Sequence, residues 1–292
     1  MNDGAPNVER PDRAERRIGR AERRAERRRG RQPGRWVPFV VLLPNAVTLL
    51  ALCAGLTAIR MAVDHRFDLA AAAIVLAVIL DGIDGRLARY LSTTSRFGAE
   101  LDSLADFVDF GVAPAVFLYI WMLEDLGSFG WICALVLAIC TALRLARFNA
   151  ALQADEPPPD WQRGFFTGVP APAGAVLALA PFALSRSIGP LPPESAALVA
   201  AYTLGAAFLM ISWLPTYSGK RIGTRLPRER VVPVLALCVL LFALFASYPF
   251  TFIAVGSLLY LAHLPFAWRS WKLQAATAIV PGGDDQPEVP ER

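Results

Sequence analysis

The sequence predicts an all-α protein, a polytopic membrane helix bundle with about eight transmembrane helices. Of its 292 residues, 55% are hydrophobic and only 18% are charged, and the mean hydropathy is +0.42. Soluble domains average about 45–50% apolar and about 25% charged residues. Apolar runs of roughly 20 residues, the length that spans a bilayer, recur along the chain. Together these features exclude a cytosolic enzyme and a disordered protein.

The predicted membrane spans follow one another with short connections. They cover residues 42–63, 68–90, 99–123, 128–149, 169–187, 194–214, 231–247 and 249–268. Turn-forming residues separate them, among them Gly127, Gly189 and Pro249. Because a single residue separates the last two spans, we expect these two helices to be antiparallel neighbours.

Basic residues predict how the chain is oriented in the membrane. Residues 1–36 hold 12 arginines and six acidic residues, a net charge of +6. Lysines and arginines also gather in the loops after the second, fourth and sixth spans and after the eighth. Since such residues mark the cytoplasmic side, we expect a cell (inner or plasma) membrane protein with both termini in the cytoplasm.

The arginine-rich arm, residues 1–36, has almost no apolar residues and is therefore not a secretory signal. We interpret it as a disordered cytoplasmic segment that lies against the anionic inner leaflet. A nucleic-acid-binding arm and a solvated tail without a specific role are the alternatives, and the favoured interpretation needs no nucleic acid. Residues 273–292, rich in Gly, Pro and Asp, are predicted to form a disordered cytoplasmic tail.

Carboxylates lie inside two of the predicted spans. The run Leu69–Leu80 is entirely apolar and covers about 18 Å, which is short of the ~30 Å hydrocarbon core. Asp81 and Asp84 are therefore expected inside the membrane, toward its cytoplasmic side. Asp102 and Asp106 lie at a similar depth on the returning helix. An ionised carboxylate at such a depth costs roughly 2.5–3.5 kcal/mol, so the group is expected to have a function.

The spacing of these aspartates predicts a metal site. Asp81 and Asp84 are three residues apart, and Asp102 and Asp106 are four apart, so each pair lines one face of its helix. Carboxylate oxygens are preferred ligands of Mg²⁺ and Mn²⁺, and Mg²⁺ usually shares its shell with phosphates. A phosphate-bearing substrate is therefore predicted. A structural salt-bridge network with the nearby arginines 86, 89 and 96 is the alternative.

The residues around the aspartates carry a resemblance to a known family. The run Asp81-Gly-Ile-Asp84-Gly85-Arg-Leu-Ala88-Arg89 is followed after eight residues by Gly98, and then by Asp102 and Asp106 at intervals of four. This pattern resembles the signature of the CDP-alcohol phosphatidyltransferases at every fixed position. The resemblance implies a six-helix catalytic core, expected at 37–220, with two further transmembrane helices at 221–272. It also implies transfer of a phosphatidyl group from a CDP-linked lipid to an alcohol, with release of CMP.

Further segments resemble the bacterial phosphatidylserine synthase branch of that family. They are Leu43–Asn45 with Thr48, Phe110–Pro114, Leu143–Asn149, Gly168–Pro170 and Ser212–Lys220. The resemblance implies CDP-diacylglycerol and L-serine as substrates and a homodimer. The same chemistry with glycerol 3-phosphate, inositol phosphate or choline as the acceptor is the alternative. A cation transporter is a remote one, because no second copy of the aspartate pattern is present.

The resemblance also implies a role for each site residue. Asp81, Asp84, Asp102 and Asp106 would bind two ions, Mg²⁺ or Mn²⁺, and Asp106 would also act as the general base. The residues expected to bind CDP-diacylglycerol are Asn45, Thr48, Gly85, Arg89, Ser95 and Gly98. Asp109 and Asn149 are expected as supporting partners.

The serine carboxylate is expected to meet basic residues at the cytoplasmic ends of helices. Arg144 and Arg147 lie one turn apart at the end of the fourth span, and Lys220 follows the sixth. A guanidinium offers a carboxylate a planar pair of donors. Anchoring of these side chains at the membrane surface is the alternative.

Overall fold

The structure is a computed structural model that describes residues 39–93, 95–152, 165–217 and 228–279. The chain divides into two units, residues 1–42 and 43–292, and the account below concerns the second. The whole arginine-rich arm, Lys220 and residues 280–292 lie outside the described residues.

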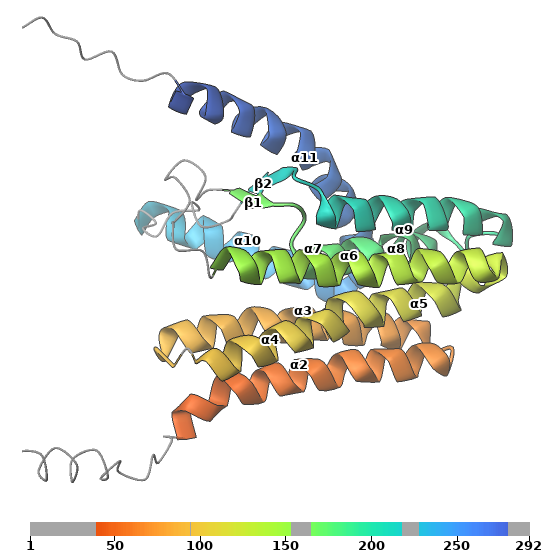
Figure 1. The fold of residues 1–292 in the computed structure, drawn as a ribbon, viewed down its shortest axis with the longest axis horizontal. Helices are drawn as coiled ribbons and strands as arrows, with labels where there is room; N and C mark the ends of the chain where they lie inside the picture. Colours follow the sequence, from red (N-terminus) through yellow and green to blue (C-terminus); the bar gives the residue numbers. More distant parts are fainter. Residues whose placement is uncertain (1–38, 94, 153–164, 218–227, 280–292) are drawn as a thin grey trace, which may run out of the picture. The chain divides into compact units, whose positions relative to one another are not determined.

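Helices make up almost all of the described chain (Figure 1). The long ones are α2 (Phe39–Val63), α3 (Phe67–Tyr90), α4 (Arg96–Phe107), α5 (Ala113–Trp121), α6 (Ser128–Leu152), α7 (Ala171–Ala178), α8 (Ala180–Ile188), α9 (Ala196–Ile211), α10 (Arg228–Ser247) and α11 (Pro249–Ile279). Short turns of helix are η1 (Val108–Val112), η2 (Leu123–Leu126) and η4 (Pro193–Ser195). The predicted all-α fold is confirmed.

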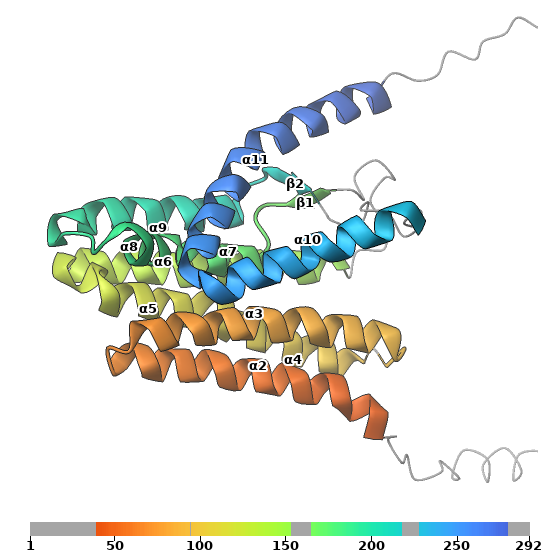
Figure 2. The ribbon, with the colours of Figure 1, turned by 180° about the vertical axis from the view of Figure 1, so that it is seen from behind.

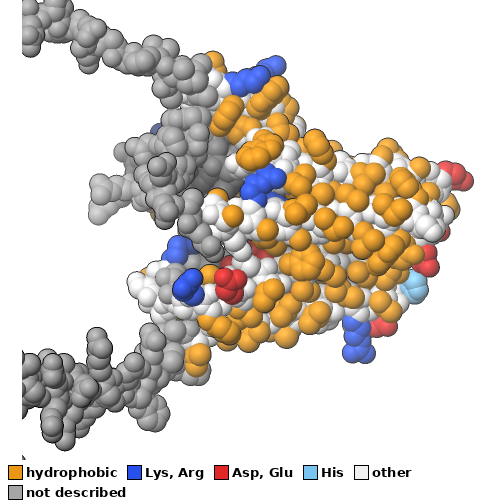
Figure 3. Space-filling model, in the orientation of Figure 1, with side chains coloured by type: hydrophobic (Ala, Val, Ile, Leu, Met, Phe, Trp, Pro, Cys, Tyr) orange, Lys and Arg blue, Asp and Glu red, His pale blue; other side chains and the backbone are white. Residues whose placement is uncertain are grey.

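Seven helical segments of the described chain are long and apolar enough to cross a membrane. They are Leu42–Val63, Arg96–Trp121, Ser128–Ala151, Ala171–Ile188, Pro193–Ile211, Arg230–Ser247 and Pro249–Gln274. The remaining predicted span, residues 68–90, forms the continuous helix α3, in which Asp68, Asp81 and Asp84 leave an uncharged apolar run of only twelve residues between Asp68 and Asp81. On the face shown in Figure 3, hydrophobic side chains cover most of the helical surface, as a multi-pass membrane protein requires.

Two of the predicted spans are interrupted. The third consists of α4 and α5 joined by η1, a π-helical turn in which the N–H of Ala113 donates to the carbonyl of Val108. The fifth is divided into α7 and α8 at Leu179, two residues before Pro181. Proline lacks the N–H that a continuous helix needs and clashes with the preceding turn. The sequence pattern did not predict either interruption, since hydropathy is insensitive to the exact hydrogen-bond register.

Small and aromatic side chains form the core. The largest fully buried side chains include Phe110, Phe117, Leu118 and Leu137, and many of the other buried residues are alanines, which let membrane helices approach closely. The most extensive helix–helix contact is between α6 and α9, which lie side by side in both views (Figures 1 and 2).

A two-stranded antiparallel sheet joins the start of α7 to the end of α9. Strand β1 (Phe165–Thr167) pairs with β2 (Pro215–Tyr217), with Phe165 opposite Tyr217. The hydroxyl of Thr216 donates to the carbonyl of Gly168 at 2.9 Å. Strand β2 also packs against α11, so α11 is held beside the end of α9. These strands were not predicted, because three residues are too few to produce a recognisable alternation.

The last two helices differ in how far they are covered. Nearly every described side chain of α10 is exposed, whereas α11 packs against α8 and β2. Helix α11 continues to Ile279, so residues 273–279 are helical rather than the disordered segment that was predicted. This stretch lacks glycine and proline, and Pro281 is the first proline after it.

Helix α2 approaches η1 closely at one glycine. Asp109 lies in η1 and is 1% exposed. A Cβ atom at Gly55 would collide with Asp109 Oδ1 and would lie 2.9 Å from its Cγ. Gly55 therefore leaves the space that the Asp109 carboxylate occupies.

We expect Gly55→Ala to destabilise the protein, because the added methyl group must displace Asp109 or separate α2 from η1. Overpacking of this kind typically costs about 1–3 kcal/mol. The measurement is the thermal unfolding midpoint of purified protein in detergent. Gly205→Ala is the matched control, since a Cβ there meets nothing within 4 Å. The double variant Gly55→Ala with Asp109→Ala should lose less stability than the sum of the single changes, and strict additivity would contradict this packing.

Candidate active site

Three of the predicted carboxylates meet between α3 and α4. Asp81 lies on α3, and Asp102 and Asp106 lie one turn apart on α4. Each offers one oxygen atom, and these three atoms lie within 4.8 Å of one another. All three side chains are partly buried. Carboxylate oxygens that are this close repel one another unless a cation or protons compensate their charge.

The fourth predicted carboxylate is the most deeply buried. Asp84 lies on the turn of α3 after Asp81 and is only 3% exposed. Among the described residues, neither of its oxygens has a hydrogen-bond partner. It interacts electrostatically with Asp102 and Asp106, although it lies outside the group of three.

The arrangement fits a hard divalent cation better than a salt-bridge network. Within the described chain, Arg86, Arg89 and Arg96 form no ion pair with the four aspartates. A buried carboxylate without a partner is costly, and metal coordination is one of the few ways to compensate it. Oxygen ligands from Asp residues are those that Mg²⁺ and Mn²⁺ take. The residues present thus suit the metal that the sequence predicts.

The residues expected to bind the nucleotide come together from three helices. Ser95 is the N-cap of α4, and its hydroxyl accepts a hydrogen bond from the N–H of Gly98 at 3.0 Å. A Cβ at Gly98 would lie 2.9 Å from Asn45 Oδ1, so the side chain from α2 rests directly on the bare backbone of α4. Thr48, one turn after Pro44, donates to the carbonyl of that proline at 3.1 Å and lies beside Asp84.

Helix α3 contributes the two remaining members of this group. A Cβ at Gly85 would lie 3.8 Å from a guanidinium nitrogen of Arg89, so the arginine folds back along its own helix over the glycine. Ser95 already caps α4, which gives it a structural role in addition to the predicted one.

The two predicted arginines both lie near the carboxylates, on α6. Arg144 is 9% exposed, its guanidinium stacks on the Phe148 ring at 5.8 Å, and it interacts electrostatically with Asp106. Arg147 donates to the carbonyl of Ile211 at 2.8 Å and stacks on the Trp213 ring at 4.6 Å. Surface anchoring does not require this burial.

Asn149 connects α6 to the carboxylate helix. Its side-chain nitrogen donates to the Ser103 hydroxyl at 2.9 Å, and that hydroxyl donates in turn to the carbonyl of Ala99. Ser103 directly follows Asp102 in the chain. The bond therefore holds the C-terminal end of α6 against the segment that carries the aspartates.

Sequence reasoning missed three residues near this site. Gly55 makes room for Asp109, and Thr216 and Tyr260 lie close to each other and to Arg144. Tyr260 could have been noticed as a phenol in a predicted membrane span. Nothing in the sequence placed it near Arg144, which is more than 100 residues away in the chain.

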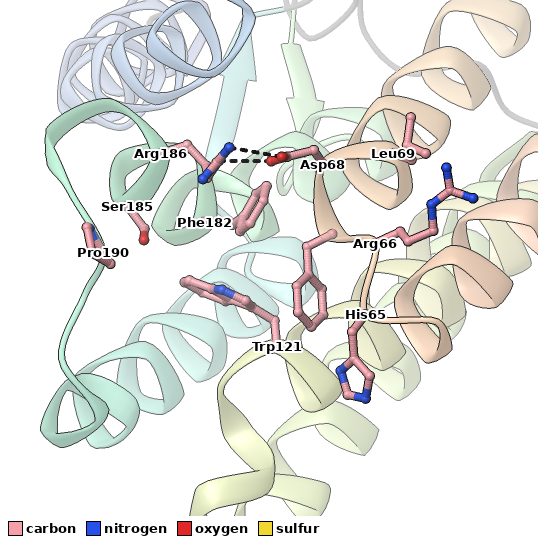
Figure 4. Close-up of a pocket in the computed structure, with 10 residues that line it drawn as sticks. His65, Arg66, Asp68, Leu69, Trp121, Phe182, Ser185, Arg186 and Pro190 are labelled. Atoms are coloured by element: carbon pink, nitrogen blue, oxygen red, sulfur yellow. Dashed lines mark hydrogen bonds and ion pairs between the residues drawn. The ribbon is translucent and has the colours of Figure 1, made fainter.

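The other end of α3 has a separate cavity of about 420 Å³ (Figure 4). Asp68 lies there, about 20 Å along the helix from Asp81. Its two carboxylate oxygens form a bidentate ion pair with Arg186, each at 2.9 Å. None of the predicted site residues lines this cavity. Its ion pair joins α3 to α8, and both partners are about half exposed.

Comparison with known proteins identifies the family. The CDP-alcohol phosphatidyltransferase model matches residues 41–218, and a second model, CDP-alcohol phosphatidyltransferase 2, matches residues 229–265. A CDP-diacylglycerol–serine O-phosphatidyltransferase of Mycobacterium bovis is 40% identical over 259 residues, which cover 89% of this chain and 88% of the relative. The enzyme of the same name from Mycobacterium leprae is 42% identical, over 80% of this chain and 77% of the relative. The one from Bacillus subtilis is 36% identical, over 58% of this chain and 86% of the relative. The chain therefore belongs to the CDP-alcohol phosphatidyltransferase family.

Proposed function

We propose that this protein transfers the phosphatidyl group of CDP-diacylglycerol to the hydroxyl of L-serine, which gives phosphatidylserine and CMP. The observation that carries the proposal is the convergence of Asp81, Asp102 and Asp106 beside buried Asp84, inside a chain that matches the family model. Serine as the acceptor is supported by the names of the relatives that align with most of the chain.

The four aspartates would hold two ions, Mg²⁺ or Mn²⁺. When bound, such a pair supplies positive charge to the diphosphate and to the oxygens that attack and leave. The protein supplies the carboxylate ligands on two adjacent helices, so their separation is set by helix packing. Asp109 in η1 is close enough to Asp81 and Asp84 for these carboxylates to repel one another, so it is proposed to add negative charge around the bound ions.

Asp106 is proposed as the general base. A hydroxyl is a poor nucleophile until a base takes its proton. Asp106 interacts electrostatically both with the other aspartates and with Arg144. The serine hydroxyl oxygen attacks the phosphorus that bears diacylglycerol, the bond to the CMP oxygen breaks, and CMP leaves with the electron pair. The proton of the hydroxyl passes to Asp106.

The nucleotide would lie along the starts of α2 and α4 and the end of α3. Gly85 and Gly98 leave space for the diphosphate and ribose, while Arg89 supplies a charge-assisted donor to phosphate. Asn45, Thr48 and Ser95 offer polar groups at the same place. Asn45 and Ser95 both lie against Gly98, which supports a preformed cradle.

The serine carboxylate would be bound by Arg144 and Arg147. Among the described residues, Nε of Arg144 and Nη1 of Arg147 are buried and have no hydrogen-bond partner. Arg147 already commits Nη2 to Ile211, so Arg144 is proposed as the main ligand. Lys220 remains a further candidate that lies outside the described residues. Buried arginines also suit a phosphate, so glycerol 3-phosphate is the second candidate acceptor.

The active site is proposed to face the cytoplasm, as the distribution of basic residues predicts. A homodimer also stays a prediction. A CMP-release assay in membranes, with serine, glycerol 3-phosphate, inositol phosphate and choline offered separately, tests the proposed function. If CMP release depends on another of these alcohols and not on serine, that alcohol is the acceptor and the proposal for serine is wrong.

Chelation should abolish CMP release. We expect EDTA to remove activity, and excess Mg²⁺ or Mn²⁺ to restore it, because the carboxylates are otherwise uncompensated. Ca²⁺ should restore little, since it prefers longer bonds and a looser geometry. Full turnover in the presence of chelator would rule out the proposed metal site.

Asp106→Asn should reduce turnover at least 100-fold, because an amide cannot accept the serine proton. Binding of CDP-diacylglycerol should survive in part, since three carboxylates remain. Equilibrium binding and single-turnover CMP release separate the two effects. Asp125→Asn, an exposed aspartate in η2, is the matched control and should behave as the wild type. Near wild-type turnover of Asp106→Asn would show that another group is the base.

Arg144→Lys should raise the KM for serine about ten- to a hundredfold, because a planar pair of donors is replaced by a point charge. The KM for CDP-diacylglycerol should change little. Ethanolamine has the hydroxyl and amine of serine without its carboxylate, so the variant should discriminate less between the two. Arg186→Lys, at the far end of the helices, is the control. An unchanged ratio of serine to ethanolamine turnover in both Arg144→Lys and Arg147→Lys would place the carboxylate elsewhere.

A further inference from the structure

We propose that Tyr260 is a specificity-determining residue of the acceptor pocket and that its hydroxyl donates a hydrogen bond to the carboxylate of the acceptor. The inference rests on the proposed function, because it takes serine as the acceptor. It adds a residue from α11, which lies beyond the six-helix core that the sequence predicts.

The position of α11 brings Tyr260 to the pocket. Helix α11 packs against β2, which holds Thr216. Tyr260 is partly buried, and its hydroxyl lies beside Thr216 and within electrostatic reach of Arg144. Figure 2 shows the two strands next to α11, close to where α9 ends.

The hydroxyl of Tyr260 has no hydrogen-bond partner among the described residues, and its atom is buried. Thr216, whose side chain lies beside this hydroxyl, donates its own proton to the carbonyl of Gly168, so its oxygen remains available to Tyr260 only as an acceptor. Buried polar groups almost always have a partner. A buried tyrosine hydroxyl without a hydrogen-bond partner therefore either destabilises the fold or is available to bind a ligand.

Three unused donors occur together here. They are the hydroxyl of Tyr260, Nε of Arg144 and Nη1 of Arg147. Arg144 interacts electrostatically with both Tyr260 and Arg147, which shows that the three side chains share one region. Because each of the three can donate and two are cationic, the group that satisfies them is an anion with several acceptor sites. A carboxylate offers about four lone pairs on two oxygens.

The proposed base lies in the same region as these donors. Arg144 interacts electrostatically with Asp106, the proposed base, so a molecule held by these donors lies close to it. In serine only two bonds separate the carboxylate carbon from the carbon that bears the hydroxyl. Binding of the carboxylate by Tyr260 and the arginines would thus leave the hydroxyl near Asp106.

Tyr260→Phe tests the inference, since it removes only the hydroxyl. We expect the KM for serine to rise about tenfold, as expected for loss of a hydrogen bond to a charged group. The KM for CDP-diacylglycerol and the kcat at saturating serine should stay within twofold of wild type. The preference for serine over ethanolamine should fall by a similar factor, since ethanolamine lacks the carboxylate. A KM does not depend on the amount of folded protein, so reduced yield does not affect the result.

Tyr202→Phe is the matched control. Tyr202 is another partly buried tyrosine of the helices, and its hydroxyl donates to the carbonyl of Leu177 at 3.0 Å. Its loss removes a structural hydrogen bond, so the variant should unfold at a lower temperature but keep the KM for serine.

The outcomes separate the two proposals. If the wild type releases no CMP in response to serine, the proposed function is wrong. If the wild type uses serine but Tyr260→Phe keeps both its serine KM and its preference over ethanolamine, the inference about Tyr260 is wrong. An equal rise of the serine KM in Tyr202→Phe would also overturn it, because the effect would then be general to packing.

Discussion

The acidic cluster inside an apolar helix bundle is the constraint on which the rest of the site depends. Asp84 has 3% of its surface exposed and no hydrogen-bond partner within the described chain. Such a charge is expensive in a low-dielectric environment, and the proposed cations would compensate it. Under the proposed function, the glycines at 85 and 98 would let the diphosphate approach the helix backbone next to these cations.

Two irregular elements of the fold, η1 and the β1–β2 pair, place polar side chains near the proposed site. The π turn η1 directly follows the helix that carries Asp102 and Asp106, and it directs Asp109 toward α2. π turns within helices occur frequently at functional sites. The short β1–β2 pair brings Thr216 to α11. Each irregularity therefore places a polar side chain where a regular helix would not.

Local patterns predicted most of the fold and the position of the acidic cluster. Hydropathy identified the long helices to within a few residues, except that α11 continues to Ile279 rather than ending near residue 268. The spacing of the aspartates correctly placed Asp81, Asp102 and Asp106 together. The π turn, the break at Leu179 and the strand pair were not predictable, because they depend on hydrogen-bond register and tertiary packing. The same holds for Tyr260, whose meeting with Arg144 is a contact between helices that are far apart in the sequence.

The proposed substrate-binding groups lie on different helices, which explains why the signature alone does not identify the acceptor. Under the proposed function, the aspartates and glycines of α3 and α4 would bind groups that every CDP-linked substrate shares, namely the diphosphate and its metals. The groups proposed for the acceptor come instead from α6 and α11, where Arg144 and Tyr260 interact with each other. If these roles hold, a change of acceptor would require changes in α6 and α11 while the signature stays intact. One fold would then combine a constant transfer site with different alcohols, and α11 would help to select the alcohol although it adds nothing to the signature.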